Sequence, residues 1–189
     1  MKDNACIFRL GSLFCRASIF FFVVASHYAA AHAATDGTLG PTSTGSLSIT
    51  ITIPPRVRIS NVADLALGTF TGTGDKTAAD DVCIYTNDPA GTYRITATGN
   101  GTGGAFTVND GASNELAYSL RWNDQTGTTG NVLLTSGTAL TGQSGANTTA
   151  SDCGGSNTAN IEATITESEL SLGEAGSYSG NVTILVEPD

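Results

Sequence analysis

The stretch GSLSITITIPP, from Gly45 to Pro55, alternates polar and apolar residues without a break and ends at two prolines. Its apolar residues are Leu47, Ile49, Ile51 and Ile53. Successive side chains of a β-strand point to opposite faces, so these four residues share one face and need one continuous apolar groove to fill. Proline has no N–H for a strand ladder, so Pro54 and Pro55 separate this strand from the chain that follows.

The segment before this strand has the features of a secretory signal peptide. Three basic residues precede or begin an apolar run at 17–30, which is too short and too interrupted for a membrane span. The sequence AHA at 31–33 fits a small-x-small cleavage site. We therefore expect residues 1–33 to be removed and the exported chain to begin at Ala34 without a membrane span. An uncleaved amino-terminal anchor is the alternative.

Charge and histidine content exclude several function classes for residues 34–189. This part of the chain has five basic and sixteen acidic residues, a net charge of 5 − 16 = −11, which disfavours nucleic acid as a partner. Both histidines precede Ala34, so Ser-His-Asp sites, Cys-His sites and histidine-containing zinc sites are excluded. We expect no enzymatic activity, no metal site and no cofactor.

Short alternating stretches separated by Gly, Asn, Asp and Ser are typical of an all-β sandwich. Nine strands are predicted, at 46–53, 56–61, 81–85, 92–98, 105–108, 116–123, 132–134, 159–165 and 177–187. The segment 128–155 is mostly small and polar, and it is expected to be a surface loop. Its few anchors would be Leu133, Leu134 and Leu140.

The exported chain keeps two cysteines, Cys83 in an apolar strand and Cys153 in a polar loop. In an oxidising compartment the default for such a pair is a disulfide, here closing a loop of about 70 residues, with two free thiols as the alternative. The single tryptophan, Trp122, is expected to fill the core, and a sugar-stacking role at the surface is its alternative.

The run AGSYSGNVTILVEP at 175–188 resembles the ending of pilus subunits of the chaperone-usher type, particularly the archaic class related to spore coat protein U. The alternating strand at 46–53, the segment LGTF at 67–70, and Val82-Cys83 followed by Tyr93-Arg94-Ile95 occur in the family's order. One departure is that the family often has a cysteine soon after the first strand, where PPRV stands at 54–57.

The resemblance implies an immunoglobulin-like β-sandwich that lacks its last strand and is completed by donor-strand exchange. Residues 34–55 would be an amino-terminal extension that carries the donor strand, with Leu47, Ile49, Ile51 and Ile53 as its groove-facing residues. Residues 56–189 would form the pilin domain. The alternative is that 46–53 is the domain's own first strand, packed in its own sheet.

The resemblance also implies partners and a location. A periplasmic chaperone, an outer-membrane usher and neighbouring subunits of a homo- or heteropolymer would bind the chain on its way through the periplasm to a surface fimbrium, which would serve adhesion or biofilm formation. The edge that meets the chaperone would consist of Tyr178, Val182, Ile184, Val186 and the carboxylate of Asp189. A freestanding or tip adhesive module that binds carbohydrate is the alternative function.

Overall fold

The computed structural model describes residues 34–189, so the predicted signal peptide lies outside the described residues. The chain divides into two units, the first ending at Thr52 and the second spanning Ile53–Asp189. All the named strands lie in the second unit. Within the described part of the chain, no helix has the length and apolar character needed to cross a bilayer.

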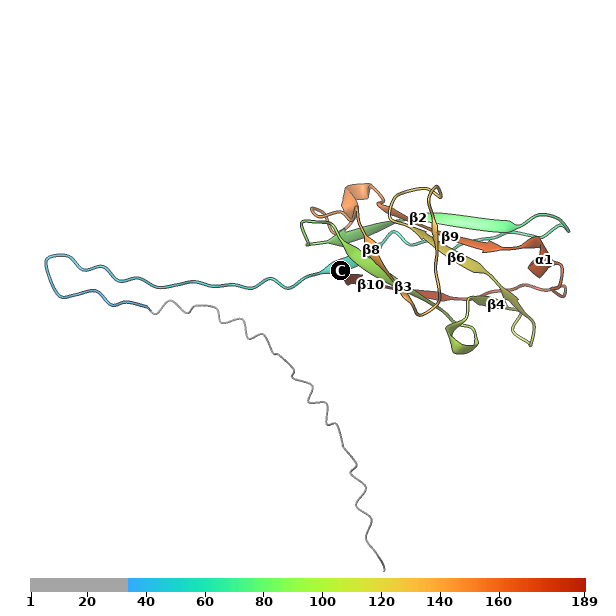
Figure 1. Cartoon of the computed structure of the whole chain (residues 1–189), viewed down its shortest axis with the longest axis horizontal. Coiled ribbons are helices and arrows are strands. Elements are labelled where there is room, and N and C mark those ends of the chain that lie inside the picture. Colours follow the sequence, from blue (N-terminus) through green and yellow to red (C-terminus); the bar gives the residue numbers. More distant parts are fainter. Residues whose placement is uncertain (1–33) are drawn as a thin grey trace, which may run out of the picture. The chain divides into compact units, whose positions relative to one another are not determined.

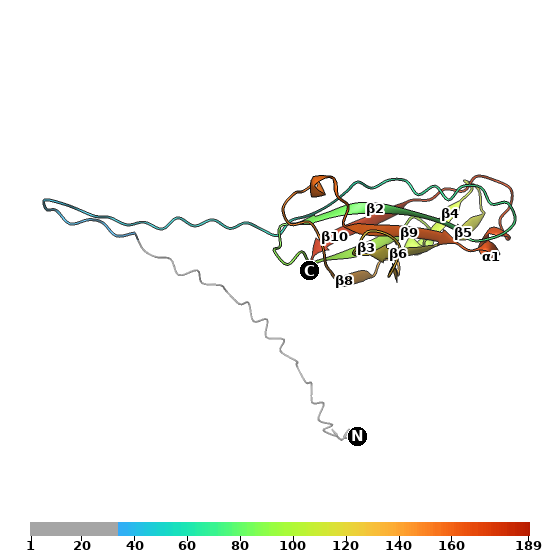
Figure 2. The same ribbon diagram turned by 90° about the horizontal axis from the view of Figure 1, so that it is seen from above.

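The second unit is an immunoglobulin-like sandwich of antiparallel sheets, as predicted (Figure 1). One sheet has the order β1 (Val57–Ser60), β2 (Lys76–Thr86), β9 (Ala159–Ile165), β6 (Ser119–Asn123) and β7 (Val132–Leu133). The other has the order β10 (Val182–Pro188), β3 (Tyr93–Gly99) and β8 (Ala139–Gln143). A hairpin is formed by β4 (Thr107–Asn109) and β5 (Glu115–Ala117), and the helical turns are η1 (Thr102–Gly104), η2 (Cys153–Gly155) and α1 (Glu167–Leu170). Figure 2 shows β2 in one layer and β3 and β8 in the other.

The core lies between the two larger sheets and is built from alternating strand residues. In β9, Ile161 and Ile165 are buried and the polar residues between them are partly exposed, as a period of two requires. Trp122 is fully buried and meets Tyr93 edge to face, with ring centroids 6.4 Å apart. The prediction that Trp122 fills the core is confirmed.

The predicted surface loop at 128–155 was wrong in part, because this segment contains β8 in addition to β7, which lies within the strand predicted at 132–134. β8 pairs with β3 through Ile95 and Leu140, and it needs few apolar residues because it is an edge strand. Leu134 is buried but Leu133 is 56% exposed, so the predicted anchoring role of Leu133 was also wrong. Pairing with a neighbouring strand of the same sheet, rather than local apolar content, gives this segment its strand structure.

The predicted strand at 116–123 is broken at Tyr118, because its two halves pair with different partners. β5 pairs with β4, whereas β6 pairs with β9 and β7. At the carboxyl end, β10 begins at Val182 rather than at the predicted residue 177. The strand predicted at 159–165 is confirmed at both ends as β9.

The predicted disulfide between Cys83 and Cys153 is confirmed, with Cα atoms 5.9 Å apart. Cys83 is a fully buried residue of β2, and Cys153 begins η2 in the loop before β9. The chain-entropy relation gives a crosslink across 70 residues a stabilisation of about 4 kcal/mol. The bond fixes the polar loop to β2, in the stretch that pairs with β1.

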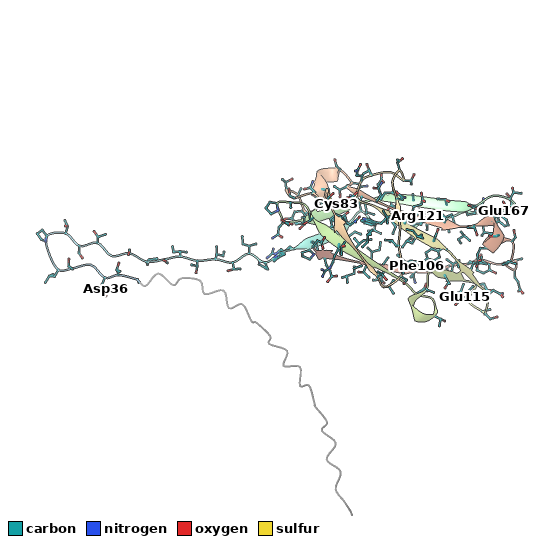
Figure 3. The ribbon with its side chains drawn as sticks, in the orientation of Figure 1. Asp36, Cys83, Phe106, Glu115, Arg121 and Glu167 are labelled. Atoms are coloured by element: carbon teal, nitrogen blue, oxygen red, sulfur yellow. A yellow bond between two sulfur atoms is a disulfide. The ribbon has the colours of Figure 1, made fainter. Side chains whose placement is uncertain are left out.

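The sandwich has two ends, which we call the carboxyl pole and the helix pole. The carboxyl pole contains Asp189 and the start of β1, where the backbone oxygen of Pro54 accepts a hydrogen bond of 3.0 Å from the Asn87 side chain. The helix pole contains α1, whose Glu167 is labelled at that end in Figure 3, whereas Cys83 lies toward the carboxyl pole. The extension therefore leaves the sandwich at the carboxyl pole.

Candidate functional site

One edge of β10 has no strand beside it among residues 34–189. Asn100 N–H donates to the Asn181 oxygen at 3.1 Å, so the backbone groups of every second residue from Asn181 face β3. The backbone groups of Val182, Ile184 and Val186 consequently face away from β3. The half-buried side chains of the same three residues pack against the core. This edge of β10 therefore offers both hydrogen-bonding groups and an apolar face.

The segment Asn61–Gly74, which connects β1 to β2, lies opposite β10 across the cavities described below. This segment has no strand assignment, and carboxylates hold it near its two ends. Ala63 N–H donates to Asp80 Oδ2 at 2.7 Å, and Gly74 N–H donates to Glu167 Oε2 at 2.8 Å. Between these points Leu65, Leu67 and Phe70 are half-buried, whereas their neighbours are exposed.

Two neighbouring cavities lie between β10 and the segment Asn61–Gly74. The cavity nearer the carboxyl pole has a volume of about 380 Å³, with Leu120, Ile161 and Ala163 in its lining. The cavity at the helix pole has a volume of about 560 Å³, with Leu116, Ile165 and Leu170 in its lining. Both are lined by Leu67 and Val108, so the two cavities adjoin, and we call them together the groove.

The groove is closed at the carboxyl pole and shaped by α1 at the helix pole. At the carboxyl pole β1 approaches β10, and Ile59 and Val186 pack against the same core. At the helix pole Thr166 Oγ1 caps α1 by accepting from Glu169 N–H at 3.3 Å. Glu169 in turn accepts a bond of 2.8 Å from Ala117 N–H, which holds the helix against β5.

The lining of the groove suits an extended apolar chain better than a charged or reactive ligand. Burial raises the pKa of the Tyr118 hydroxyl, which lies beside the first cavity. Only Asp64, Lys76 and Glu174 bring charge to the two cavities. Within residues 34–189 no three side chains gather in a way that could hold a metal ion.

Most residues of the predicted chaperone edge lie along one wall of this groove. Val182 and Ile184 line the first cavity, and Tyr178 lines the second, where its hydroxyl donates to the Glu174 oxygen at 3.1 Å. Val186 lies at the closed end, and Asp189 is exposed at the carboxyl pole, where its side chain accepts from Gly142 N–H at 2.7 Å. The role of these residues toward a chaperone stays a prediction.

The opposite wall, Asn61–Gly74, was missed as a site by sequence reasoning. A weak strand pattern was present in the large apolar residues Leu65, Leu67 and Phe70. Alanine and glycine between and around them make the alternation of polar and apolar residues hard to recognise. The motif at 67–70 was used only as a mark of resemblance.

No protein-family model matches the chain, and no curated protein matches its sequence. Two of the solved structures that match are partly similar in fold. One is a chaperone–tip adhesin complex of CFA/I fimbriae biogenesis, 23% identical with a TM-score of 0.47, covering 70% of this chain and 41% of that chain. The other is a mutant of CfaE, the CFA/I adhesin of enterotoxigenic E. coli, 18% identical with a TM-score of 0.46, covering 71% and 43%. This chain thus spans about two fifths of the chains that it matches, and the likeness concerns the fold alone.

The predicted donor strand contrasts with the groove in its burial. Leu47, Ile49, Ile51 and Ile53 are 73%, 89%, 86% and 69% exposed, and none of them belongs to an assigned strand. The first strand that pairs within a sheet is β1, which begins at Val57. The same chain therefore holds an open apolar groove and an exposed apolar segment of strand-like pattern.

Proposed function

We propose that this protein is an exported structural subunit of a surface pilus, and that its groove binds the segment Ser46–Ile53 of another subunit. The observation that carries the proposal is the apolar groove that runs beside the unpaired edge of β10. A strand placed there would bury its apolar face on the floor and hydrogen-bond with both walls, which is the chemistry of β-strand addition. The role is structural rather than enzymatic.

The segment Ser46–Ile53 fits such a groove in three respects. It has no charged side chain, so no ion has to be desolvated when it is buried. Its four aliphatic side chains recur at every second residue, the spacing that places them all on one face. Each contributes about 1.5–3 kcal/mol when it is fully buried, and the hydrogen bonds with the two walls add to this.

The direction of the inserted strand follows from the two poles. The extension leaves its own sandwich at the carboxyl pole, so a linear fibre forms when it enters its neighbour from the helix pole. Ile53 would then lie at the neighbour's helix pole and Leu47 toward its carboxyl pole, antiparallel to β10. The opposite direction would bring two carboxyl poles together, and reciprocal exchange would close a dimer instead of a fibre.

An unfilled groove explains why a chaperone belongs to the proposal. An exposed strand edge beside an apolar surface is a template for uncontrolled pairing with other chains. A periplasmic chaperone that covers β10 would prevent this until an outer-membrane usher brings two subunits together. The assembled fimbrium at the cell surface would then serve adhesion or biofilm formation.

The test compares two sets of substitutions in cells that normally produce the protein. In the first, Leu47, Ile49, Ile51 and Ile53 are all replaced by Ser; in the second, the four polar residues between Gly45 and Ile53 are all replaced by Ala. Surface-extracted protein is then run on a denaturing gel without strong heating. We expect a ladder of oligomers from the second variant and none from the first. A ladder from the first variant would refute the donor role of this segment.

A further inference from the structure

The described extension begins with a hairpin that closes at Ser46, the first residue of the proposed donor strand. Thr35 N–H donates to the Ser46 oxygen at 2.9 Å, and Ser46 N–H donates to the Thr35 oxygen at 3.0 Å. The hydroxyl oxygens of the two residues are 2.6 Å apart. Figure 1 shows the chain doubling back between these residues. We call the segment Thr35–Ser46 the N-terminal hairpin.

Two glycines allow the arms of this hairpin to lie side by side. A Cβ at Gly37 would collide with the Ser43 side chain, and a Cβ at Gly45 would lie 3.2 Å from the Thr35 oxygen. At Gly40, by contrast, the nearest atom to a Cβ is the Thr42 oxygen at 3.5 Å, an ordinary contact. The hairpin thus depends on glycine at some positions and not at others.

We propose that the N-terminal hairpin is a stop that sets how far the donor strand slides along the groove of a second copy of this chain. This inference rests on the proposed function. It assigns a role to residues that have no apolar pattern of their own and lie outside the strand itself.

Backbone directions explain why the hairpin acts as a stop. The apolar residues of an antiparallel donor strand must lie opposite the inward-facing residues of β10, whose backbone groups also face the groove. Leu47 and the other odd-numbered residues then bond to β10, and the even-numbered residues face the wall Asn61–Gly74. Because Ser46 is even-numbered and its backbone groups are already bonded to Thr35, the first arm of the hairpin, which contains Thr35, occupies the place of that wall. The hairpin therefore cannot move past the closed end of the groove, where β1 approaches β10.

The positions of the cavities set the register in which the hairpin reaches this closed end. Both cavities are filled when Leu47 lies opposite Ile184 and each following apolar residue lies two residues further toward the helix pole. Ile49 then lies opposite Val182, and Ile53 lies opposite Tyr178, which lines the larger cavity. In this register Ser48 is opposite Thr183, on the outer face.

Cysteine pairs on the outer face report the register. In an antiparallel sheet, residues opposite each other at a non-hydrogen-bonded pair are close enough for a disulfide. In the double variant Ser48→Cys/Thr183→Cys, a disulfide between two copies reports the register set by the hairpin. In the double variant Ser48→Cys/Leu185→Cys, it reports a donor strand that has slipped two residues toward the carboxyl pole. Thr183 and Leu185 are both exposed, and Cys83 and Cys153, the two cysteines of residues 34–189, are already bonded to each other.

The experiment measures these crosslinks in oxidised polymers of the full chain, taken from cells that normally produce it. With an intact hairpin we expect about tenfold more crosslinked dimer from the Thr183 pair than from the Leu185 pair. Gly37→Val should bring the two yields close together, and so should Thr35→Pro, which removes the N–H that donates to Ser46. The matched control, Gly40→Val, should keep the preference.

Two contrary results are distinguishable. Equal crosslinking of the two pairs with an intact hairpin, or an unchanged preference after Gly37→Val and Thr35→Pro, would overturn the stop while leaving strand exchange in place. Polymers that form without crosslinks at either position would show that Ser46–Ile53 does not lie beside β10. That result would overturn the proposed function and the stop together.

Discussion

The segment Ser46–Ile53 and β10 have nearly the same sequence pattern but opposite environments. Both place aliphatic side chains at every second residue and end near a proline. In β10 the aliphatic residues Val182, Ile184 and Val186 are half-buried and the strand pairs with β3 along its whole length. In the extension, the most exposed of the four, Ile49, shows 89% of its surface.

Alternation therefore specifies a strand face but not the partner that covers it. β10 has a partner on one side only, and its other side opens onto the groove. The extension has an apolar face and no described strand beside that face. An exposed segment of strand-like pattern and an open groove in one chain are the two complementary parts that strand exchange would require.

The largest effect should come from placing a charge on the apolar face of the extension. Ile51→Asp would put an unpaired carboxylate in an apolar cavity, at a cost of about 4 kcal/mol or more. The matched control is Thr50→Asp on the opposite face, which stays in water. We expect the ladder of oligomers on a gel to disappear with Ile51→Asp and to persist with Thr50→Asp. Equal loss with both variants would mean that the groove does not distinguish the two faces.

Sequence reasoning found β9 and the disulfide because the first depends on a local pattern and the second on the chemistry of one compartment. β9 alternates cleanly, and Cys83 and Cys153 are the only cysteines after the predicted cleavage site. β8 was missed because its pairing with β3 is a long-range contact, and its small polar residues form no pattern that indicates a strand.

The groove could be predicted only through the resemblance, because its walls come from distant parts of the chain. Asn61–Gly74 and β10 are separated by more than a hundred residues, and no local pattern in either segment indicates that a strand is missing between them. The N-terminal hairpin was also missed, since a single residue pair closes it. Its one local signal was Gly40-Pro41 at the turn, which is typical of a chain reversal.

A smaller effect should separate the two regions by stability rather than assembly. Ile184→Ala removes half-buried methyl groups from the sandwich, so it should lower the free energy of unfolding of the monomer by roughly 1–2 kcal/mol. Ile49→Ala removes equally large groups from an exposed position, so its effect on the monomer should stay within about 0.5 kcal/mol. Urea denaturation of monomeric chain, isolated by size exclusion, measures both. A large loss from Ile49→Ala would mean that the extension packs on its own sandwich.

The smallest effect should be on the pH dependence of stability. Acid should destabilise the sandwich, whereas residues of the extension should not contribute to this loss. The side-chain hydrogen bond from Thr92 and the backbone bond from Ala90 lower the pKa of Asp88, whose carboxylate organises the loop between β2 and β3. Because the folded pKa lies below the unfolded one, this stabilisation is present above the ordinary carboxyl pKa and is lost as the pH falls through the folded value.

Asp88→Asn should therefore flatten the fall of melting temperature below about pH 4, the range in which carboxyl groups titrate. The matched control, Asp36→Asn, lies in the extension and should leave the melting curve of the sandwich as it is at every pH. Melting temperatures measured from pH 3 to pH 7, in steps of about one unit, separate the two variants across the carboxyl range. If Asp36→Asn shifted the acid limb as much as Asp88→Asn, the extension would have to share the sandwich's unfolding transition. The contrast between β10, which is packed on the core, and the exposed segment Ser46–Ile53 would then no longer hold.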